Sequence, residues 1–165
     1  VQDYKVAVKW YREAAEQGDV DAQHNLGVMF EHGQGVAQDH KAAVKWYRKA
    51  AERGLAGAQY NLGLMYKNGQ GVVQDYKAAM KWYRMAAKQG FPKAQYNLGA
   101  IYAKGQGVKS DKISGHMWLN IAVTSGHKNA VKARGMVAGK MSSSDVVKAQ
   151  ERAKRCMAFG YKRCD

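Results

Sequence analysis

The fold is decided by residues 38–73, which read QDHKAAVKWYRKAAERGLAGAQYNLGLMYKNGQGVV. The same pattern precedes this stretch at 2–37, follows it at 74–109 and continues in a degenerate form at 110–141. Equivalent residues are 36 positions apart: Asp3, Asp39, Asp75 and Asp111; Trp10, Trp46, Trp82 and Trp118; Gly18, Gly54, Gly90 and Gly126. Such a fixed period is typical of a solenoid, in which one supersecondary unit stacks on its own copies.

Each repeat is predicted to form two helices. In the first, Asp39 is a candidate N-cap, because its side-chain oxygen can accept a hydrogen bond from an otherwise unpaired backbone N–H. Helical periodicity gives this helix an apolar stripe and an opposite charged one. The apolar stripe holds Ala43, Trp46, Tyr47, Ala50 and Ala51, and the charged one holds Lys41, Lys45, Arg48 and Glu52. Gly54 can take the positive φ that ends a helix. We expect Trp46 to be largely buried.

The second helix of each repeat carries a stripe of small and apolar side chains, namely Ala58, Leu62, Met65 and Tyr66. In the third repeat Pro92 stands at the first helical position, where its missing N–H has no partner in any case. Gly63 lies inside this helix and recurs as Gly27, Gly99 and Gly135, although a glycine there costs about 1 kcal/mol relative to alanine. We therefore expect a neighbouring helix to approach these glycines too closely for a Cβ.

These residues resemble a known repeat family. The pattern Ala43-x-x-Trp46-Tyr47-x-x-Ala50-Ala51-x-x-Gly54, followed by Ala58-x-x-x-Leu62-Gly63-x-x-Tyr66-x-x-Gly69-x-Gly71-Val72-x-x-Asp75, is similar to the Sel1-like repeat (SLR), a relative of the tetratricopeptide repeat with the same period. Agreement covers residues 2–109 and then weakens. The resemblance implies an all-α fold, a right-handed α/α solenoid that acts as an adaptor between proteins. Bacterial members of this family are often exported or placed in the envelope.

The fourth repeat, 110–141, departs from the pattern. Ile113 and Met117 replace the lysines of the exposed stripe, so an outer face has turned apolar and must be covered. Within the terminal segment 142–165, several serines offer N-caps, and Val146, Ala149, Ala153 and Met157 follow at helical spacing. We expect a capping helix at about 144–159 that is ended by Gly160. Its polar face would carry Lys148, Arg152, Lys154 and Arg155.

The net charge of +14 is concentrated in the C-terminal half. Residues 1–72 hold 9 basic and 8 acidic side chains, whereas residues 73–165 hold 18 and 5. A basic surface attracts acidic partners, although lysines also simply solvate exposed helix faces. The sequence contains no apolar run long enough to predict a membrane-spanning helix. Because Val1 aligns with Ala37 and Val73 in the inter-repeat loop, we expect the chain to be a piece of a longer solenoid that lacks N-terminal repeats or a targeting segment.

The only cysteines are Cys156 and Cys164. On one continuous helix they would be about 12 Å apart, too far for a disulfide, but Gly160 can end the helix and let the chain fold back. The resemblance favours a bridge, because such two-cysteine tails look like those of exported SLR proteins. Two outcomes stay open: a disulfide in the bacterial periplasm or outside the cell, and two free thiols in the cytoplasm.

The sequence offers little for catalysis or metal binding. His24 and His32 are about 12 Å apart along a helix, too far to share one ion, and we expect no metal or cofactor. Ser125 and Lys128 match the S-x-x-K motif of penicillin-recognising enzymes, but the K-T-G partner motif is absent. Since some cysteine-rich SLR relatives are connected with β-lactams, a β-lactam-binding or -hydrolysing enzyme is a remote alternative. Otherwise we expect a non-enzymatic protein.

Two classes of function remain. The first is a protein-interaction scaffold that binds a peptide or partner protein in a concave groove. The second is a basic surface that binds a polyanion, either nucleic acid or an envelope polymer. Nucleic acid is the weaker candidate, because the aromatic residues among the lysines belong to the buried stripe and cannot stack on bases. We expect the protein to be a monomer.

The second helix of each repeat resembles the one that lines the concave surface of tetratricopeptide superhelices. Its residues that project away from the buried stripe form ladders across the repeats, such as Val28, Leu64 and Ala100. The predicted groove residues are His24, Val28, His32, Tyr60, Leu64, Lys67, Asn68, Tyr96 and Lys104. Tyrosine beside aliphatic side chains is typical of a binding hot spot, although these tyrosines could merely shield the backbone.

The groove is predicted to turn from acidic to basic. Asp21 and Glu31 lie toward its first repeat, and Lys93 and Lys104 toward its third. An extended peptide or partner helix is therefore expected to bind with its acidic end toward repeat three. Asn25, Asn61 and Asn97 lie at the edge of the buried stripe, and we expect them to be structural, with hydrogen bonds to the loop of the adjacent repeat.

Overall fold

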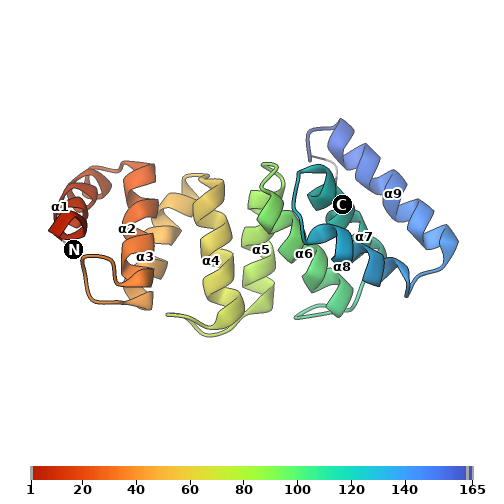
Figure 1. Ribbon diagram of the computed structural model, residues 1–165, viewed down its shortest axis with the longest axis horizontal. Helices are drawn as coiled ribbons and strands as arrows, with labels where there is room; N and C mark the ends of the chain where they lie inside the picture. Colours follow the sequence, from red (N-terminus) through yellow and green to blue (C-terminus); the bar gives the residue numbers. More distant parts are fainter. Residues whose placement is uncertain (1, 163, 165) are drawn as a thin grey trace. The chain divides into compact units, whose positions relative to one another are not determined.

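The computed structural model describes residues 2–162 and 164, which form helices and connecting turns without a strand. The helices are α1 (Gln2–Glu16), α2 (Val20–His32), α3 (His40–Glu52), α4 (Ala56–Asn68), α5 (Tyr76–Ala87), α6 (Pro92–Lys104), α7 (Lys112–Thr124), α8 (Ala130–Ala138) and α9 (Ser143–Ala158). The fold is an α/α solenoid of helix pairs, as the 36-residue period predicts (Figure 1).

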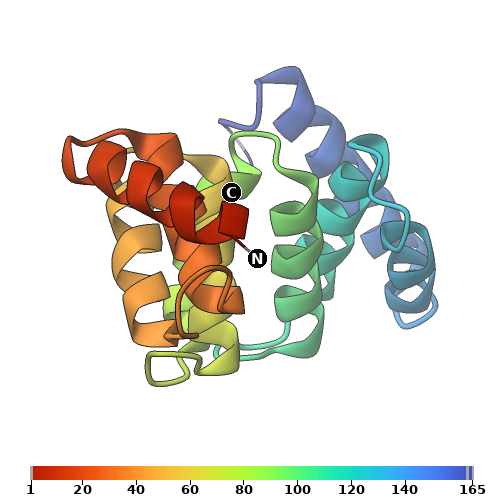
Figure 2. The ribbon, with the colours of Figure 1, turned by 60° about the vertical axis from the view of Figure 1, so that its left-hand side comes forward.

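The chain divides into two compact units, Val1–Ala79 and Met80–Asp165. In the N-terminal unit, α1 packs on α2, α2 on α3 and α3 on α4. In the C-terminal unit, α7 packs on α6, α8 and α9, and Figures 1 and 2 both show α9 running beside it. The helices with the Leu-Gly pattern are α2, α4 and α6, and α8 is their degenerate counterpart.

The helix ends form as predicted. The carboxylate of Asp39 accepts hydrogen bonds from the backbone N–H groups of Lys41 and Ala42, at 2.9 and 3.0 Å. Asp75 and Asp111 occupy the same position and accept equivalent bonds. At the other end of α3, Gly54 has a φ of 96°, and Pro92 starts α6. The aspartate N-caps and the glycine terminators are thus confirmed.

The core of the N-terminal unit is centred on Tyr47, not on the neighbouring tryptophan. Ala43, Tyr47, Ala50 and Ala51 are fully buried, and Val44 joins them. Trp46 is only half-buried and packs at the margin of the core, where the Lys49 ammonium lies 4.4 Å from its ring centroid. The expectation of a largely buried Trp46 is therefore wrong, because this side chain lies at the edge of the apolar stripe.

The glycines at equivalent positions of the Leu-Gly helices behave differently along the chain. A Cβ at Gly27 would lie 2.6 Å from the Tyr47 ring, and a Cβ at Gly99 would lie 2.9 Å from the backbone oxygen of Gly115. Close helix approach is confirmed at these two positions. At Gly135 a Cβ would meet nothing within 4 Å, so the expectation is wrong there, since α8 is short and its pattern is degenerate.

A buried glutamine links the two helices at each of three equivalent positions. Gln23, Gln59 and Gln95 are at most 5 % exposed. Their Nε2 atoms donate to the backbone oxygens of Ala15, Ala51 and Ala87 at 3.1, 3.1 and 3.3 Å. Each of these carbonyls lies in the last turn of its helix and also accepts the backbone N–H of the glycine three residues later, Gly18, Gly54 or Gly90, so the glutamine adds a second bond to it. The fourth repeat has Val131 at this position, and α8 is the shortest helix described.

A second recurring contact joins the first helix of a repeat, which carries the Trp-Tyr pair (α1, α3 or α5), to the Leu-Gly helix that follows it. Arg48 donates to the Tyr66 hydroxyl at 2.6 Å, and Arg84 donates to the Tyr102 hydroxyl. At the first equivalent position, the Arg12 guanidinium lies 6.0 Å from the Phe30 ring centroid. These arginines, of which Arg12 and Arg48 are exposed and Arg84 is half-buried, therefore also connect the first helix of a repeat to the second.

The capping helix is confirmed, with boundaries shifted by one residue. Ser142 is the N-cap of α9, and Gly160 follows its end with a φ of 57°. Ala149, Ala153 and Cys156 are buried, whereas Val146 and Met157 are half-buried. The helix covers the apolar outer face of α7 only in part: Met117 is 1 % exposed, but Ile113 stays half-buried.

A disulfide joins Cys156 near the end of α9 to Cys164, with Cα atoms 4.6 Å apart. Gly160 and Tyr161 both have positive φ and turn the chain back. The Tyr161 ring lies 3.3 Å from where a Cβ of Gly90 would be. The bridged tail is thus laid against the turn between α5 and α6.

Reduction of this disulfide is expected to lower the free energy of unfolding by at most about 2–3 kcal/mol, because it closes a short loop. Intact mass after alkylation, with and without prior reduction, checks that the bridge forms, and denaturation of the two forms gives its contribution. Alkylation of both cysteines in the unreduced protein would contradict the bridge.

Candidate partner-binding surface

The predicted groove residues of the N-terminal unit lie on α2 and α4. A Cβ at Gly57 of α4 would lie 3.6 Å from the His24 ring of α2, so the two helices are neighbours. His24, Val28, Tyr60, Leu64 and Lys67 are half-buried, and His32 and Asn68 are exposed. We call these seven residues the α2–α4 surface. Their mixture of half-buried and exposed side chains leaves both apolar and polar groups accessible.

Hydrogen bonds on the buried side of this surface hold its residues in place. The hydroxyl of buried Tyr47 donates to Glu31 at 2.5 Å. Burial, together with that carboxylate, raises the pKa of Tyr47 far above its usual value. Asn61 Nδ2 lies 3.1 Å from His24 Nε2, and the His24 and Tyr47 ring centroids are 5.7 Å apart. Asn61 therefore bonds to a helix side chain of the preceding repeat and not to its loop, which corrects the expectation from sequence.

His24 is held neutral near pH 7. Burial lowers its pKa and outweighs the opposing charges of Asp21 and Glu31, which act to raise it. Since Glu31 also accepts the Tyr47 hydroxyl, part of the acidic end predicted from sequence is engaged inside the unit. The remaining exposed carboxylate of that pair is Asp21.

A shallow pocket of about 270 Å³ continues this side of the unit between α1 and α2. Its lining comprises Tyr4, Ala7, Tyr11, Asn25, Val28, Met29 and Gln34. Of these, only Val28 is a predicted groove residue. The α1 tyrosines were not predicted, because the resemblance to tetratricopeptide superhelices places the binding surface on the second helix of each repeat.

The C-terminal unit carries a better-formed groove between α6, α7 and α8. This α6–α8 groove has a volume of about 290 Å³. Its apolar part is formed by Tyr96, Ala100, Ala103, Leu119, Ala133, Met136 and Val137. Its border carries three lysines, Lys104, Lys112 and Lys140. The predicted residues Tyr96 and Lys104 therefore come together in one site.

Tyr96 is held in place by a stacked histidine. Its ring centroid lies 4.4 Å from that of His127, with an angle of 11° between the planes. Burial lowers the pKa of His127, and the charge of Lys93 lowers it further. The imidazole is consequently neutral near pH 7, and it presents Tyr96 to the groove without adding a charge.

Met136 and Lys140 were not predicted, although the sequence carried a signal for both. Met136 lies 36 positions after Ala100, and Lys140 lies 36 positions after Lys104. The degenerate fourth repeat therefore continues both ladders. Met136 is 59 % exposed, which makes it the most accessible apolar group of the groove.

The metal-binding and catalytic candidates of the sequence can be placed in the structure. Within 2–162 and 164, no cluster of three or more His, Cys, Asp or Glu side chains could hold a metal ion. Ser125 is the C-cap residue of α7, and Lys128 is exposed in the turn after it. None of the described helices combines the length and apolarity needed to cross a membrane.

The repeat pattern matches a known family over most of the chain. The Sel1 repeat model matches residues 1–19, 20–55, 56–91 and 92–127. This chain belongs to the Sel1-repeat family. Each complete match starts with the Leu-Gly helix, half a repeat later than the units 2–37, 38–73 and 74–109 used above. Segment 110–141 and the capping segment 142–165 extend beyond the last match.

Two solved structures extend the comparison. One is c5321, a protective antigen present in uropathogenic Escherichia coli strains and displaying an SLR fold, with 34 % identity and a TM-score of 0.86. The alignment covers 94 % of this chain but only 34 % of c5321. The other is a Sel1 repeat protein from Oxalobacter formigenes, with 41 % identity and a TM-score of 0.69, covering 76 % of this chain and 94 % of that protein. No match was found among curated proteins.

Sel1-repeat proteins are generally protein-interaction scaffolds and are typically not enzymes. The Sel1 repeats of this chain therefore point to a protein as the partner. The residues that place it in the family are the buried and turn-forming ones described above.

Proposed function

We propose that this Sel1-repeat protein is a monomeric, non-enzymatic scaffold that binds an acidic, partly apolar segment of another protein in the α6–α8 groove. The observation that carries the proposal is the combination of an apolar floor and a border of three lysines. Apolar side chains of the partner would bury against Met136 and Tyr96, and carboxylates would lie beside Lys104, Lys112 and Lys140.

The energetics favour Tyr96 as an anchor for such a segment. A tyrosine ring buries a large area while losing little rotamer freedom, and stacking on His127 already restricts this one. The lysines contribute mainly to the rate of encounter and to the orientation of the ligand. One of them is already positioned, since Lys112 Nζ donates to the backbone oxygen of Lys140 at 3.2 Å.

The α2–α4 surface is proposed as a second contact for the same class of partner. Tyr60 and Leu64 would contribute apolar area there, and neutral His24 would contribute a hydrogen bond. The basic groove suits the acidic end of the ligand, which is the orientation that the distribution of charge predicts. The disulfide supports placement in an oxidising compartment, the periplasm or the exterior of the cell.

The proposal is tested by capture of partners from the native organism on the immobilised protein, followed by mass spectrometry. With a partner identified, Tyr60→Ala combined with Tyr96→Ala is expected to weaken binding at least about tenfold, roughly 1.4 kcal/mol. Calorimetry measures the affinity, and circular dichroism checks that the fold survives.

The matched control neutralises two lysines of the Trp-Tyr helices, Lys45 and Lys81, by substitution with glutamine. Lys45 and Lys81 are exposed and lie outside the residues proposed to bind, so the affinity should change little. A large loss of affinity in this control, with no loss in the tyrosine variant, would place the binding site on the first helices of the repeats instead. A steep fall in affinity with salt would then favour a polyanion as the ligand.

A further inference from the structure

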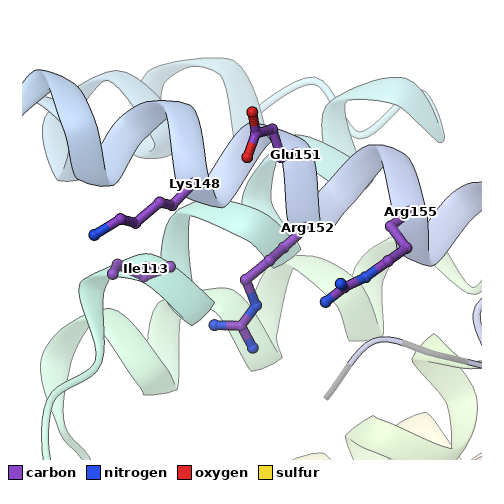
Figure 3. Close-up of a pocket in the computed structure, with 5 residues that line it drawn as sticks. All are labelled: Ile113, Lys148, Glu151, Arg152 and Arg155. Atoms are coloured by element: carbon purple, nitrogen blue, oxygen red, sulfur yellow. The ribbon is translucent and has the colours of Figure 1, made fainter.

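A hollow between the start of α7 and the side of α9 lies apart from the α6–α8 groove. Its volume is about 350 Å³, and it is lined by Ile113, Lys148, Glu151, Arg152 and Arg155. Figure 3 shows Arg152 and Arg155 extending in the same direction from α9, while the carboxylate of Glu151 points the other way. We propose that this arginine hollow binds an acidic segment of a protein, as a second docking site beside the groove.

The apolar part of the hollow is an incompletely covered position of the repeat. Ile113 stands where the earlier repeats have Lys41 and Lys77. The capping helix buries Met117 one turn further on but leaves Ile113 half-buried. An aliphatic side chain in place of a lysine, still accessible beside a cationic helix, offers a partner both an apolar and a charged contact.

The two arginines supply the charge. Lys148 Nζ lies 3.7 Å from an Asp145 oxygen, so its charge is partly balanced. Over the described part of the chain, neither the Arg152 nor the Arg155 side chain makes a hydrogen bond or an ion pair. Their guanidinium N–H groups are therefore available to bind a carboxylate through two parallel hydrogen bonds.

The neighbouring carboxylate does not compete for these donors. Burial would raise the pKa of Asp111, but hydrogen bonds from Ser114 outweigh it, and the charge of Arg152 lowers the pKa further. The Ser114 hydroxyl donates to Asp111 at 2.6 Å, and its backbone N–H donates at 2.9 Å. Asp111 is thus committed to capping α7, while Arg152 helps to keep it ionised.

The lining favours a peptide over a nucleic acid. Among the described residues, no aromatic side chain lines the hollow, so bases would find no ring there to stack on. Glu151 at the rim would repel a continuous row of phosphates. A peptide instead offers separate carboxylates for Arg152 and Arg155 and an aliphatic side chain for Ile113, and it can leave the neighbourhood of Glu151 uncharged.

The test uses the whole protein and a fluorescein-labelled peptide in which glutamates flank a leucine, with anisotropy as the readout. Arg152→Gln combined with Arg155→Gln is expected to weaken binding at least about tenfold. The control, Lys128→Gln with Lys132→Gln, removes the same charge from exposed positions outside the hollow and should change the affinity less than about twofold. Melting curves check that both variants are folded.

Nuclear magnetic resonance locates the peptide independently of any substitution. Its binding should shift the backbone amide signals of Ile113, Arg152 and Arg155, whether or not those of Tyr96 and Met136 in the groove also shift. Equal losses in both double variants, or shifts confined to the groove, would overturn the arginine hollow. Tighter binding of a single-stranded oligonucleotide than of the peptide would overturn the proposed occupant. In the Tyr96→Ala variant, which weakens the groove, the signals of Ile113, Arg152 and Arg155 should still shift, so the two proposals fail separately.

Discussion

Tyr47→Ala is expected to lower the free energy of unfolding by about 3–5 kcal/mol, the loss typical of a large buried aromatic side chain. Tyr47 is fully buried, its ring fills the space left by Gly27, and its hydroxyl is bound by Glu31. Removal of the ring leaves a cavity at the contact between α2 and α3. Denaturant titration followed by circular dichroism measures the loss.

Two neighbouring substitutions make this prediction specific. Tyr47→Phe keeps the ring and removes the hydrogen bond to Glu31, which should cost about 1–2 kcal/mol. Trp46→Ala should also cost only about 1–2 kcal/mol, because Trp46 is half-buried and less apolar area is lost. A loss for Trp46→Ala that equals or exceeds the loss for Tyr47→Ala would place the centre of the core on the tryptophan after all.

Gly71→Ala is expected to be comparably severe, at about 3 kcal/mol or more. Gly71 has a φ of 70°, and a Cβ there would overlap the backbone carbonyl group of His40. The substitution therefore combines the strain of left-handed backbone with a collision against the first turn of α3. The oxygen and carbon atoms of this carbonyl group belong to the backbone and not to a flexible side chain, so the loop or the helix must move.

Gly54→Ala separates the two causes. Gly54 also has a positive φ, 96°, but a Cβ there would meet nothing within 4 Å. This variant should lose only the backbone term of about 1–2 kcal/mol. Thermal melts of the two single variants give the comparison. Equal melting temperatures would show that the contact with His40 adds nothing.

The helix pairs, their caps and the terminal helix could all be predicted, because each depends on local chemistry repeated at a fixed spacing. Asp39, Gly54 and Pro92 act within one or two turns of their own helix, and Ser142 does so at the start of α9. The disulfide pairing depended instead on how the chain turns after Gly160, which left free thiols as an open alternative.

The errors arose where a side chain depends on its neighbours in space. Helical projection puts Trp46 and Tyr47 on the same stripe, but packing between helices buries only the second one. Asn61 was predicted to bond to a loop because projection cannot show that His24 lies closer. Met136 and Lys140 were missed because the fourth repeat departs from the pattern elsewhere, although both continue the ladders that line the groove.

The buried glutamines bear on how proteins of this kind change length. Gln23, Gln59 and Gln95 each bond to a carbonyl eight residues earlier, so the angle between the two helices is specified entirely within a short segment of the gene. Duplication or deletion of one 36-residue period therefore keeps the glutamine and the carbonyl that it bonds together, whichever repeats are its neighbours. Recombination between copies can therefore lengthen or shorten the array without redesigning a single junction, while the exposed ladder positions remain free to diverge toward new partners.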